Sequence, residues 1–216
     1  MDLENIHPPN NPDKFFPWLK EMSERYWETI EINRGIFGFQ IQKATKWLPG
    51  LSDEQIAEYE KEMGFSFREV YKLYLRQMNG TDLPTINIYG ECGEPYRCAS
   101  GYYSYPRDLT TVKETIKWVH EEFGVTPEFI EENKIPRIMP IVSHRFFVVD
   151  QCAEAPVLSM YGRDSIFYAP SLESFLVNDI FKGGRITIVA DDSAVEVKFW
   201  LDDEAATNVI EAEGEI

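Results

Sequence analysis

Positive charge is scarce in this sequence. The 216 residues include 21 Lys and Arg against 37 Asp and Glu, which gives a formal net charge of −16. Because binding to phosphates requires clustered Lys and Arg, this balance argues against free nucleic acid as a partner. It disfavours an anionic membrane surface for the same reason. A basic protein is the favoured partner, since opposite charges speed the encounter of two proteins.

Long apolar runs are also missing, and cysteine is rare. No apolar run approaches the roughly 18–20 residues needed to span a bilayer. The N-terminal stretch MDLENIHPPNNPDKFF has neither the basic start nor the apolar segment of a signal peptide. The three cysteines, Cys92, Cys98 and Cys152, are few and odd in number, which is typical of reduced thiols. We therefore expect a soluble protein of the cytoplasm.

Motifs for phosphate, metal or nucleophilic chemistry are absent as well. The chain has no GxxxxGK[ST] loop, no GxGxxG and no GxSxG elbow. Cys92 and Cys98 are separated by five residues, whereas a zinc knuckle separates its cysteines more tightly. No histidine has a second ligand at a spacing such as HxxxH. The sequence therefore predicts no metal, no cofactor and no catalytic residue.

The run SHRFFVVD, residues 143–150, contains the side chains that are most readily interpreted as a catalytic group. His144 could act as a base and Arg145 could hold an anion. The competing interpretation is that His144 caps or hydrogen-bonds the start of a strand. A hydrolase would also need Asp150 or Cys152 to meet them in one concave pocket. A hydrolase is therefore the less favoured alternative, and we expect no enzyme.

What the sequence has in quantity is apolar and aromatic residues, at 44% and 14%. This composition supports a substantial core in a single domain with extensions. We expect a polar arm over 1–12, an N-terminal helix and short strand over 13–46, and a core domain over 47–182. A C-terminal hairpin and acidic tail would follow over 183–216.

The stretch LPGLSDEQIAEYEKEMGFSF, residues 48–67, contains the clearest helix signals. Ser52 and Gln55 have the spacing of a capping box at the start of a helix. Gly64 fits its C-terminal cap. The spacing of four residues between Glu54, Glu58 and Glu62 puts their carboxylates in one stripe. We interpret this stripe as a solvated face, because a catalytic carboxylate pair needs one buried member.

Further patterns predict a mixture of helices and strands. The predicted helices cover 67–78, a segment from a capping box at Thr111 and Glu114 to Phe123, 127–133 after Thr126, and the segment LESFLVNDIF, which Ser171 caps. The predicted strands are 84–90, RIMPIV, FFVVD and PVLSMY, with a hairpin over 185–201. The fold class is therefore α+β, with helices packed against a mostly antiparallel sheet.

The loop GYYSYPRDL places Tyr102, Tyr103 and Tyr105 close to an arginine. Exposed tyrosines beside arginine are typical of protein-binding surfaces. Packing of these rings beneath the loop is an equally good interpretation, and the sequence leaves both open.

The order of motifs resembles the SUKH superfamily. The pattern WLPGLS is followed by an acidic helix ending in Gly64-Phe65, then by VYKLYL and Asn79-Gly80, and later by MPIVSHRFFVVD, PVLSMYGRDSIFYA and SLESFL. The resemblance covers residues 47–181. It departs from the family at Arg68, where a proline is usual. It implies a SUKH-like α+β domain without catalysis that binds and neutralises a toxin domain, often a nuclease or a deaminase.

From these observations we expect a non-catalytic immunity protein against a cognate polymorphic toxin, with a basic nuclease as the favoured class. A regulatory or scaffold module of the same fold is the alternative. The residues expected to contact the partner are exposed acids and members of the aromatic loop: Glu54, Glu58, Asp82, Glu91, Glu94, Tyr102, Tyr103 and Asp164.

Overall fold

The computed structural model describes residues 7–35, 38–87, 97–152, 155–181 and 197–202. The chain divides into two compact units. Unit 1 contains residues 1–108 and 177–187, and unit 2 contains residues 109–176 and 188–216. Helices and antiparallel strands occur in both units, so the predicted α+β class is confirmed. No helix in the described ranges is long and apolar enough to cross a membrane.

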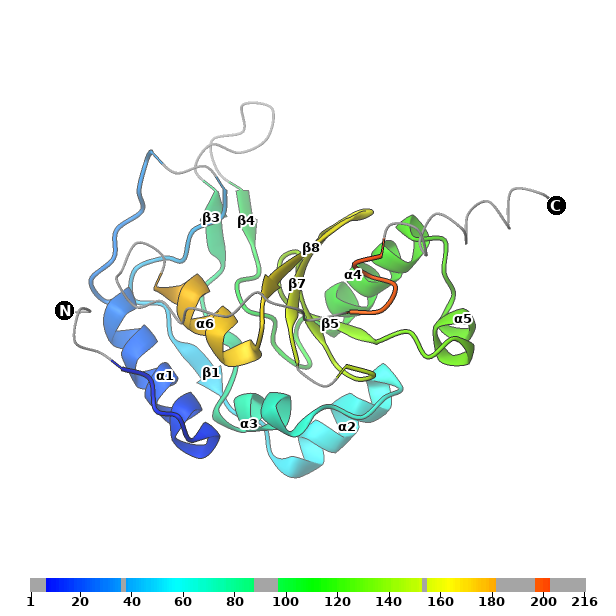
Figure 1. Cartoon of the computed structure of the whole chain (residues 1–216). Coiled ribbons are helices and arrows are strands. Elements are labelled where there is room, and N and C mark those ends of the chain that lie inside the picture. The colour runs from blue at the N-terminus through cyan, green and yellow to red at the C-terminus, as the bar shows by residue number, and fades with distance from the viewer. Residues whose placement is uncertain (1–6, 36–37, 88–96, 153–154, 182–196, 203–216) are drawn as a thin grey trace. The chain divides into compact units, whose positions relative to one another are not determined.

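Unit 1 combines helices with two small antiparallel ribbons (Figure 1). Strand β1 pairs with β2, and β3 pairs with β4. Of the short strand expected within residues 13–46, the described residues ahead of β1 form an isolated bridge between Gln40 and Ile86 and no longer pairing. The elements of this unit are α1 (Pro12–Trp27), β1 (Trp47–Pro49), α2 (Asp53–Met63), α3 (Glu69–Gln77), β2 (Met78–Thr81), β3 (Thr85–Asn87) and β4 (Arg97–Ala99).

Helix α1 supplies a large part of the core of unit 1. Its N-cap is Asn11, whose side chain accepts a hydrogen bond from Asp13 N at 2.8 Å. Phe16 and Leu19 on its inner face are fully buried. The Phe16 ring lies edge-on to Tyr74 of α3, with 6.0 Å between centroids. Helix α1 therefore packs its apolar face against α3 within unit 1.

Helix α2 begins and ends where its capping residues predict. The Ser52 hydroxyl accepts from Gln55 N, and the Gln55 side chain accepts from Ser52 N, which completes the capping box. Gly64 ends the helix in the left-handed conformation with φ of 80°. Leu51 and Ile56 are both buried at this helix start, as a hydrophobic staple requires. These local signals suffice because each joins residues only a few positions apart.

Unit 2 contains a four-stranded antiparallel sheet in the order β5-β6-β7-β8. Helix α4 packs against the sheet at β5 (Figure 1). The elements are α4 (Leu109–Glu122), α5 (Pro127–Glu132), β5 (Ile138–Val142), β6 (Arg145–Val148), β7 (Val157–Tyr161), β8 (Asp164–Ala169) and α6 (Leu172–Ile180), whose last residues belong to unit 1.

Two predictions for these elements need correction. Helix α4 begins at Leu109, so the capping box predicted at Thr111 and Glu114 is wrong. The reason is that Asp108 N already bonds to Ser104 O at 2.7 Å, which gives the preceding turn helical spacing. Strand β8 was missing from the predicted sheet. Its Ile166 is 54% exposed, so the strand lacks the usual alternation of buried apolar and exposed polar residues.

Residues 197–202 form a turn that packs into the core of unit 2. Phe199 and Trp200 are buried, and Trp200 Nε1 donates to Pro136 O at 2.6 Å. The end of the predicted hairpin over 185–201 is therefore a turn, whereas residues 182–196 and the predicted acidic tail from 203 on lie outside the described residues. This turn covers the α4 side of the core, where His120 stacks on Trp200.

The first prediction compares two glycines with similar backbone conformations. Gly64 and Gly80 have φ of 80° and 73°. A Cβ at Gly64 would meet no atom within 4 Å, whereas one at Gly80 would lie 2.6 Å from Tyr102 O and 2.7 Å from Tyr103 O. We expect Gly64→Ala to lower the free energy of unfolding by about 1–2 kcal/mol through left-handed strain alone. Gly80→Ala should lower it by about 3–5 kcal/mol, because overpacking adds to that strain. Urea unfolding followed by tryptophan fluorescence measures both, and equal losses would contradict the expectation.

The second prediction concerns pH. Burial lowers the pKa of His120 to about 4, from an ordinary value of 6.5. Between these values the unfolded chain binds the proton more readily than the folded chain, so the free energy of unfolding should fall as pH drops from 6.5 toward 4. The full contribution should be present above pH 6.5. His120→Gln should reduce this pH dependence, as measured by urea unfolding at several pH values. An unchanged slope in the variant would show that His120 titrates normally in the folded protein.

Candidate interaction surface

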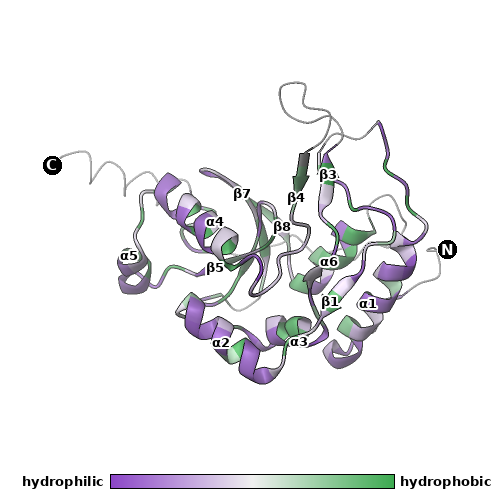
Figure 2. Cartoon of the chain, turned by 180° about the vertical axis from the view of Figure 1, so that it is seen from behind, coloured by the Kyte–Doolittle hydropathy of each residue, from purple (hydrophilic) through white to green (hydrophobic). Residues whose placement is uncertain are grey.

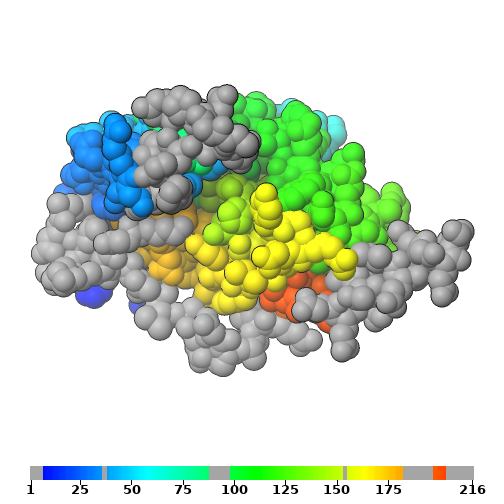
Figure 3. Space-filling model, turned by 90° about the horizontal axis from the view of Figure 1, so that it is seen from above, coloured from blue at the N-terminus to red at the C-terminus, as the bar shows by residue number. Residues whose placement is uncertain are grey.

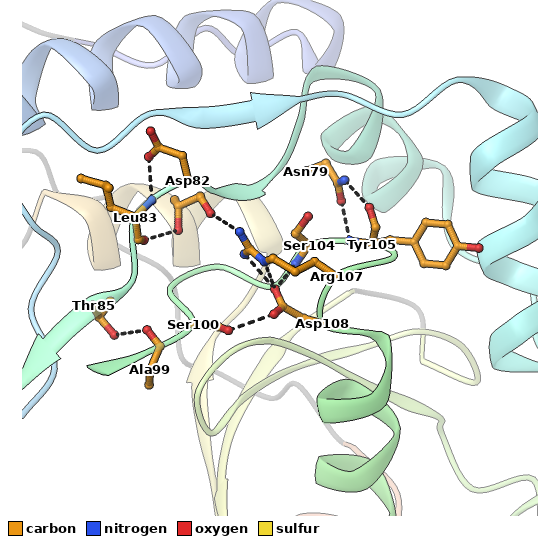
Figure 4. A network of polar contacts seen from close by, with 11 residues as sticks. Asn79, Asp82, Leu83, Thr85, Ala99, Ser100, Ser104, Tyr105, Arg107 and Asp108 are labelled. Atoms are coloured by element: carbon orange, nitrogen blue, oxygen red, sulfur yellow. Dashed lines mark hydrogen bonds and ion pairs between the residues drawn. The ribbon is translucent and has the colours of Figure 1, made fainter. Parts of the chain in front are cut away.

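A network of polar contacts in unit 1 is centred on the Asp108 carboxylate (Figure 4). Oδ1 accepts from Ser100 Oγ at 2.9 Å. Oδ2 accepts from Ser104 N at 2.8 Å, and from Arg107 Nε and Nη2 at 3.1 and 2.8 Å. The Asp108 side chain is only 7% exposed. These four bonds satisfy a carboxylate that would otherwise be costly to bury.

Strand β2 ties the same loop down from the other side. Asn79 Nδ2 donates to Tyr105 O at 2.6 Å, and Tyr105 N donates back to Asn79 Oδ1 at 2.9 Å. Arg107 Nη1 donates to Thr81 O at 2.8 Å. Figure 4 shows Asn79 and Tyr105 facing one another across this pair of bonds. Loop residues 100–108 are therefore fixed to β2 at two points.

This anchoring decides how the loop tyrosines lie. Tyr102 is 1% exposed, packs on Trp47 with 4.8 Å between centroids, and donates its hydroxyl to Asp179 at 2.8 Å. Tyr105 is 8% exposed and stacks on Tyr59 at 4.4 Å. Tyr103 remains partly exposed. Packing beneath the loop is thus the correct interpretation for Tyr102 and Tyr105, and Tyr102 is not part of an exposed surface.

The stripe of acids on α2 lies on the surface, as predicted. Glu54, Glu58 and Glu62 are exposed, and Figure 2 shows α2 coloured mostly as hydrophilic. Hydrogen bonds with Ser52 and with its own backbone N–H lower the pKa of Glu54. Burial, and then the negative charges of Glu58 and Glu62, raise the pKa of the Tyr105 phenol. The acidic face of α2 therefore reaches the anchored loop through Tyr105.

Two other acids of this region are tied into the structure. Asp53 pairs with Arg76 at 2.8 Å, and Glu60 pairs with Lys72 at 2.8 Å. Both pairs join α2 to α3. In the described part of the chain, neither Glu54 nor Glu58 forms an ion pair. The helix therefore uses some acids to hold its position and presents others to solvent.

Asp82 is exposed, at the start of the turn between β2 and β3. Its Oδ1 accepts from Lys46 N and from Leu83 N, each at 2.7 Å. Beside it is a pocket of about 220 Å³ lined by residues 81–84, 100–101 and 107–108. Sites for drug-sized ligands have volumes of about 300–1,000 Å³. The pocket is therefore small for a cofactor.

The remaining predicted contact residues do not all fall in unit 1. Asp164 is exposed in unit 2, paired with Tyr161 across the β7–β8 hairpin. Tyr161 and Ile166 are 72% and 54% exposed on the same hairpin, and Figure 3 shows the yellow β7–β8 segment at the surface of this view. Glu91 and Glu94 lie outside the described residues.

Two of the side chains proposed for a hydrolase, His144 and Asp150, lie beyond opposite ends of β6. His144 precedes β6 and Asp150 follows it, so a strand rise of about 3.3 Å per residue separates them by roughly 20 Å. Asp150 accepts from Arg137, and Arg145 donates to Ser159 Oγ and stacks over the Tyr168 ring. No group of three potential metal ligands occurs among the residues that the structure describes.

Sequence reasoning missed Asn79 and Asp108 as the residues that organise this surface. Both are buried polar residues. The adjacent Arg107-Asp108 pair is visible in the sequence, but adjacent charges are common on exposed turns. Nothing local indicates that Asp108 is buried beneath the loop, because Ser100 and Ser104 reach it only after the loop closes.

The third prediction tests this anchor. Asp108→Ala leaves Nε and Nη2 of Arg107, the Ser100 hydroxyl and the Ser104 N–H without their acceptor. We expect the free energy of unfolding to fall by about 2–4 kcal/mol, given a cost of 1–3 kcal/mol for each buried group left unsatisfied. The exposed Asp164→Ala should change it by less than about 0.5 kcal/mol. Urea unfolding measures both variants, and similar small losses would show that the network contributes little.

Comparison with known families agrees with this architecture. A model described as the SMI1 / KNR4 family (SUKH-1) matches residues 50–178. No curated protein is similar enough to the chain to count as a match. The matched segment begins just before α2, ends within α6 and includes the Asp108 network. Because it covers more than half of the 216 residues, the chain belongs to the SMI1 / KNR4 family (SUKH-1).

Proposed function

We propose that this chain is an immunity protein that binds a cognate toxin protein in the cytoplasm and blocks its activity, without catalysis of its own. The SUKH family includes immunity proteins. The observation that carries the proposal is the exposed acidic face of α2 in a chain of net charge −16. A nuclease must attract the phosphates of its substrate, so its binding cleft is basic. Carboxylates on the surface of an inhibitor can occupy the positions of those phosphates.

The rigidity of α2 supports its use as a binding face. The helix is capped at both ends and tied to α3 through Asp53 and Glu60. A surface that is already ordered loses less conformational entropy when it binds. Glu54 and Glu58 are therefore the central contacts in our proposal, with Asp82 and the partly exposed Tyr103 also in unit 1. Asp164, Glu91 and Glu94 remain further candidates.

The fourth prediction tests binding. The natural ligand is the C-terminal domain of a polymorphic toxin encoded beside the gene for this chain, and we expect a Kd in the nanomolar range by calorimetry. Glu54→Gln with Glu58→Gln should weaken binding by at least about tenfold and reduce its dependence on salt, since two charges are lost with little change in shape. The control is Glu114→Gln with Glu132→Gln, which removes two exposed acids of unit 2 and should leave the Kd within about twofold.

Absence of binding to that toxin domain would contradict the immunity function. A regulatory or scaffold module of the same fold would instead recover several unrelated partners in affinity purification and no toxin. If the toxin binds tightly but the α2 variants behave like the control, the function stands and the assigned face is wrong.

A further inference from the structure

The pocket beside Asp82 carries an uncompensated negative charge. Its lining includes two carboxylates, Asp82 and Asp108, and one guanidinium, Arg107. Asp108 Oδ2 accepts two hydrogen bonds from Arg107, so these two charges neutralise each other. No described Lys, Arg or His side chain forms an ion pair with Asp82. The charge left at this pocket is therefore that of Asp82.

The Asp82 carboxylate is fixed in place before any partner arrives. Two backbone N–H groups, from Lys46 and Leu83, donate to Oδ1 at 2.7 Å. Within the described part of the chain, Oδ2 accepts no hydrogen bond. Two charge-assisted bonds hold one oxygen and leave the other available to a donor from outside.

Lys46 contacts Asp82 but does not neutralise its carboxylate. Lys46 gives only its backbone N–H to this carboxylate. Its ammonium group instead pairs with Glu28 at 2.8 Å and with Glu24 at 3.6 Å. The ammonium group of Lys46 is thus paired with other acids of unit 1 and not with Asp82.

Size and lining indicate what the pocket would accept. A volume of about 220 Å³ suits a single side chain rather than a cofactor. Leu83 and Pro84 supply apolar surface beside the charge of Asp82. Long basic side chains bury their methylene groups along apolar surface while their charged end meets a carboxylate. Arginine fits this combination best, because its fork of N–H donors matches a carboxylate.

We propose that this pocket receives an arginine side chain of the toxin, whose guanidinium donates to Asp82 Oδ2. The inference rests on the proposed function for the identity of the partner, while the preference for a guanidinium follows from the pocket alone. It adds to the acidic face of α2 a defined point of attachment.

The fifth prediction tests the pocket with a small probe. N-acetyl-arginine methylamide is titrated into the full chain labelled with 15N, and amide shifts are followed by NMR. The shifts should concentrate at Lys46 and Leu83, whose N–H groups bond to Asp82. The matched probe N-acetyl-citrulline methylamide has nearly the same shape but no charge, and it should cause no saturable shifts. Shifts of equal size from both probes, or shifts spread over every acidic surface, would overturn the proposal.

Asp82→Asn is the decisive variant, since an asparagine Oδ1 can still accept both backbone N–H bonds while the charge is removed. Its amide spectrum checks that the fold is retained. We expect the apparent affinity for the arginine probe to fall about fivefold, the upper range for an exposed ion pair. Glu132→Gln removes one exposed acid of unit 2 and should leave the affinity unchanged. Equal effects of the two variants would show that only net charge matters.

Measuring how tightly the toxin domain binds the Asp82→Asn variant distinguishes this inference from the proposed function. If Asp82→Asn weakens toxin binding at least about tenfold, the pocket is part of the interface. If the toxin binds tightly and Asp82→Asn has no effect, the pocket proposal fails while the immunity function stands. If the arginine probe binds at Asp82 but no toxin binds, the guanidinium site stands and the immunity function fails.

Discussion

The closure of loop 100–108 onto strand β2 is the constraint on which the candidate surface depends. One nearly buried carboxylate, Asp108, accepts four hydrogen bonds from three residues of the loop. Asn79 fixes the loop again through both of its amide atoms. With these contacts in place Tyr105 stacks on Tyr59 of α2, so the acidic helix and the loop form one continuous part of unit 1. The buried charge is tolerable here because both oxygens of the Asp108 carboxylate accept hydrogen bonds.

The acids of unit 1 divide into two classes with different consequences. Asp53, Glu60 and Asp108 each pair with a basic residue and hold elements together. Glu54, Glu58 and Asp82 are exposed and form no ion pair within the described residues. An uncompensated carboxylate contributes little to stability, but it attracts a basic partner over a distance set by the salt concentration. The large negative charge of the chain is therefore used partly for folding and partly, in our proposal, for recognition.

Local patterns succeeded where the interacting residues are close in sequence. The capping box at Ser52, the cap at Gly64 and the Thr126 start of α5 all form as expected, because they join residues within four positions. The predicted start of α4 was wrong, because Asp108 organises the turn that precedes the helix. Strand β8 was missed because its apolar Ile166 faces solvent, so apolar and polar residues do not alternate between the buried and exposed faces. The hydrolase hypothesis combined His144 and Asp150, which lie beyond opposite ends of β6.

By itself the sequence determined the fold class, the ends of α2 and α5, the exposed acidic stripe of α2 and the family of the chain. These features follow from short-range capping, periodicity and the order of motifs. Only the tertiary structure decided that Tyr102 and Tyr105 are buried, that Asp108 is the anchor of their loop, and that Asp82 borders a pocket. The physical reason is distance along the chain: Asp82 meets Lys46, and Asn79 meets Tyr105, through contacts that exist only once the segments have packed together.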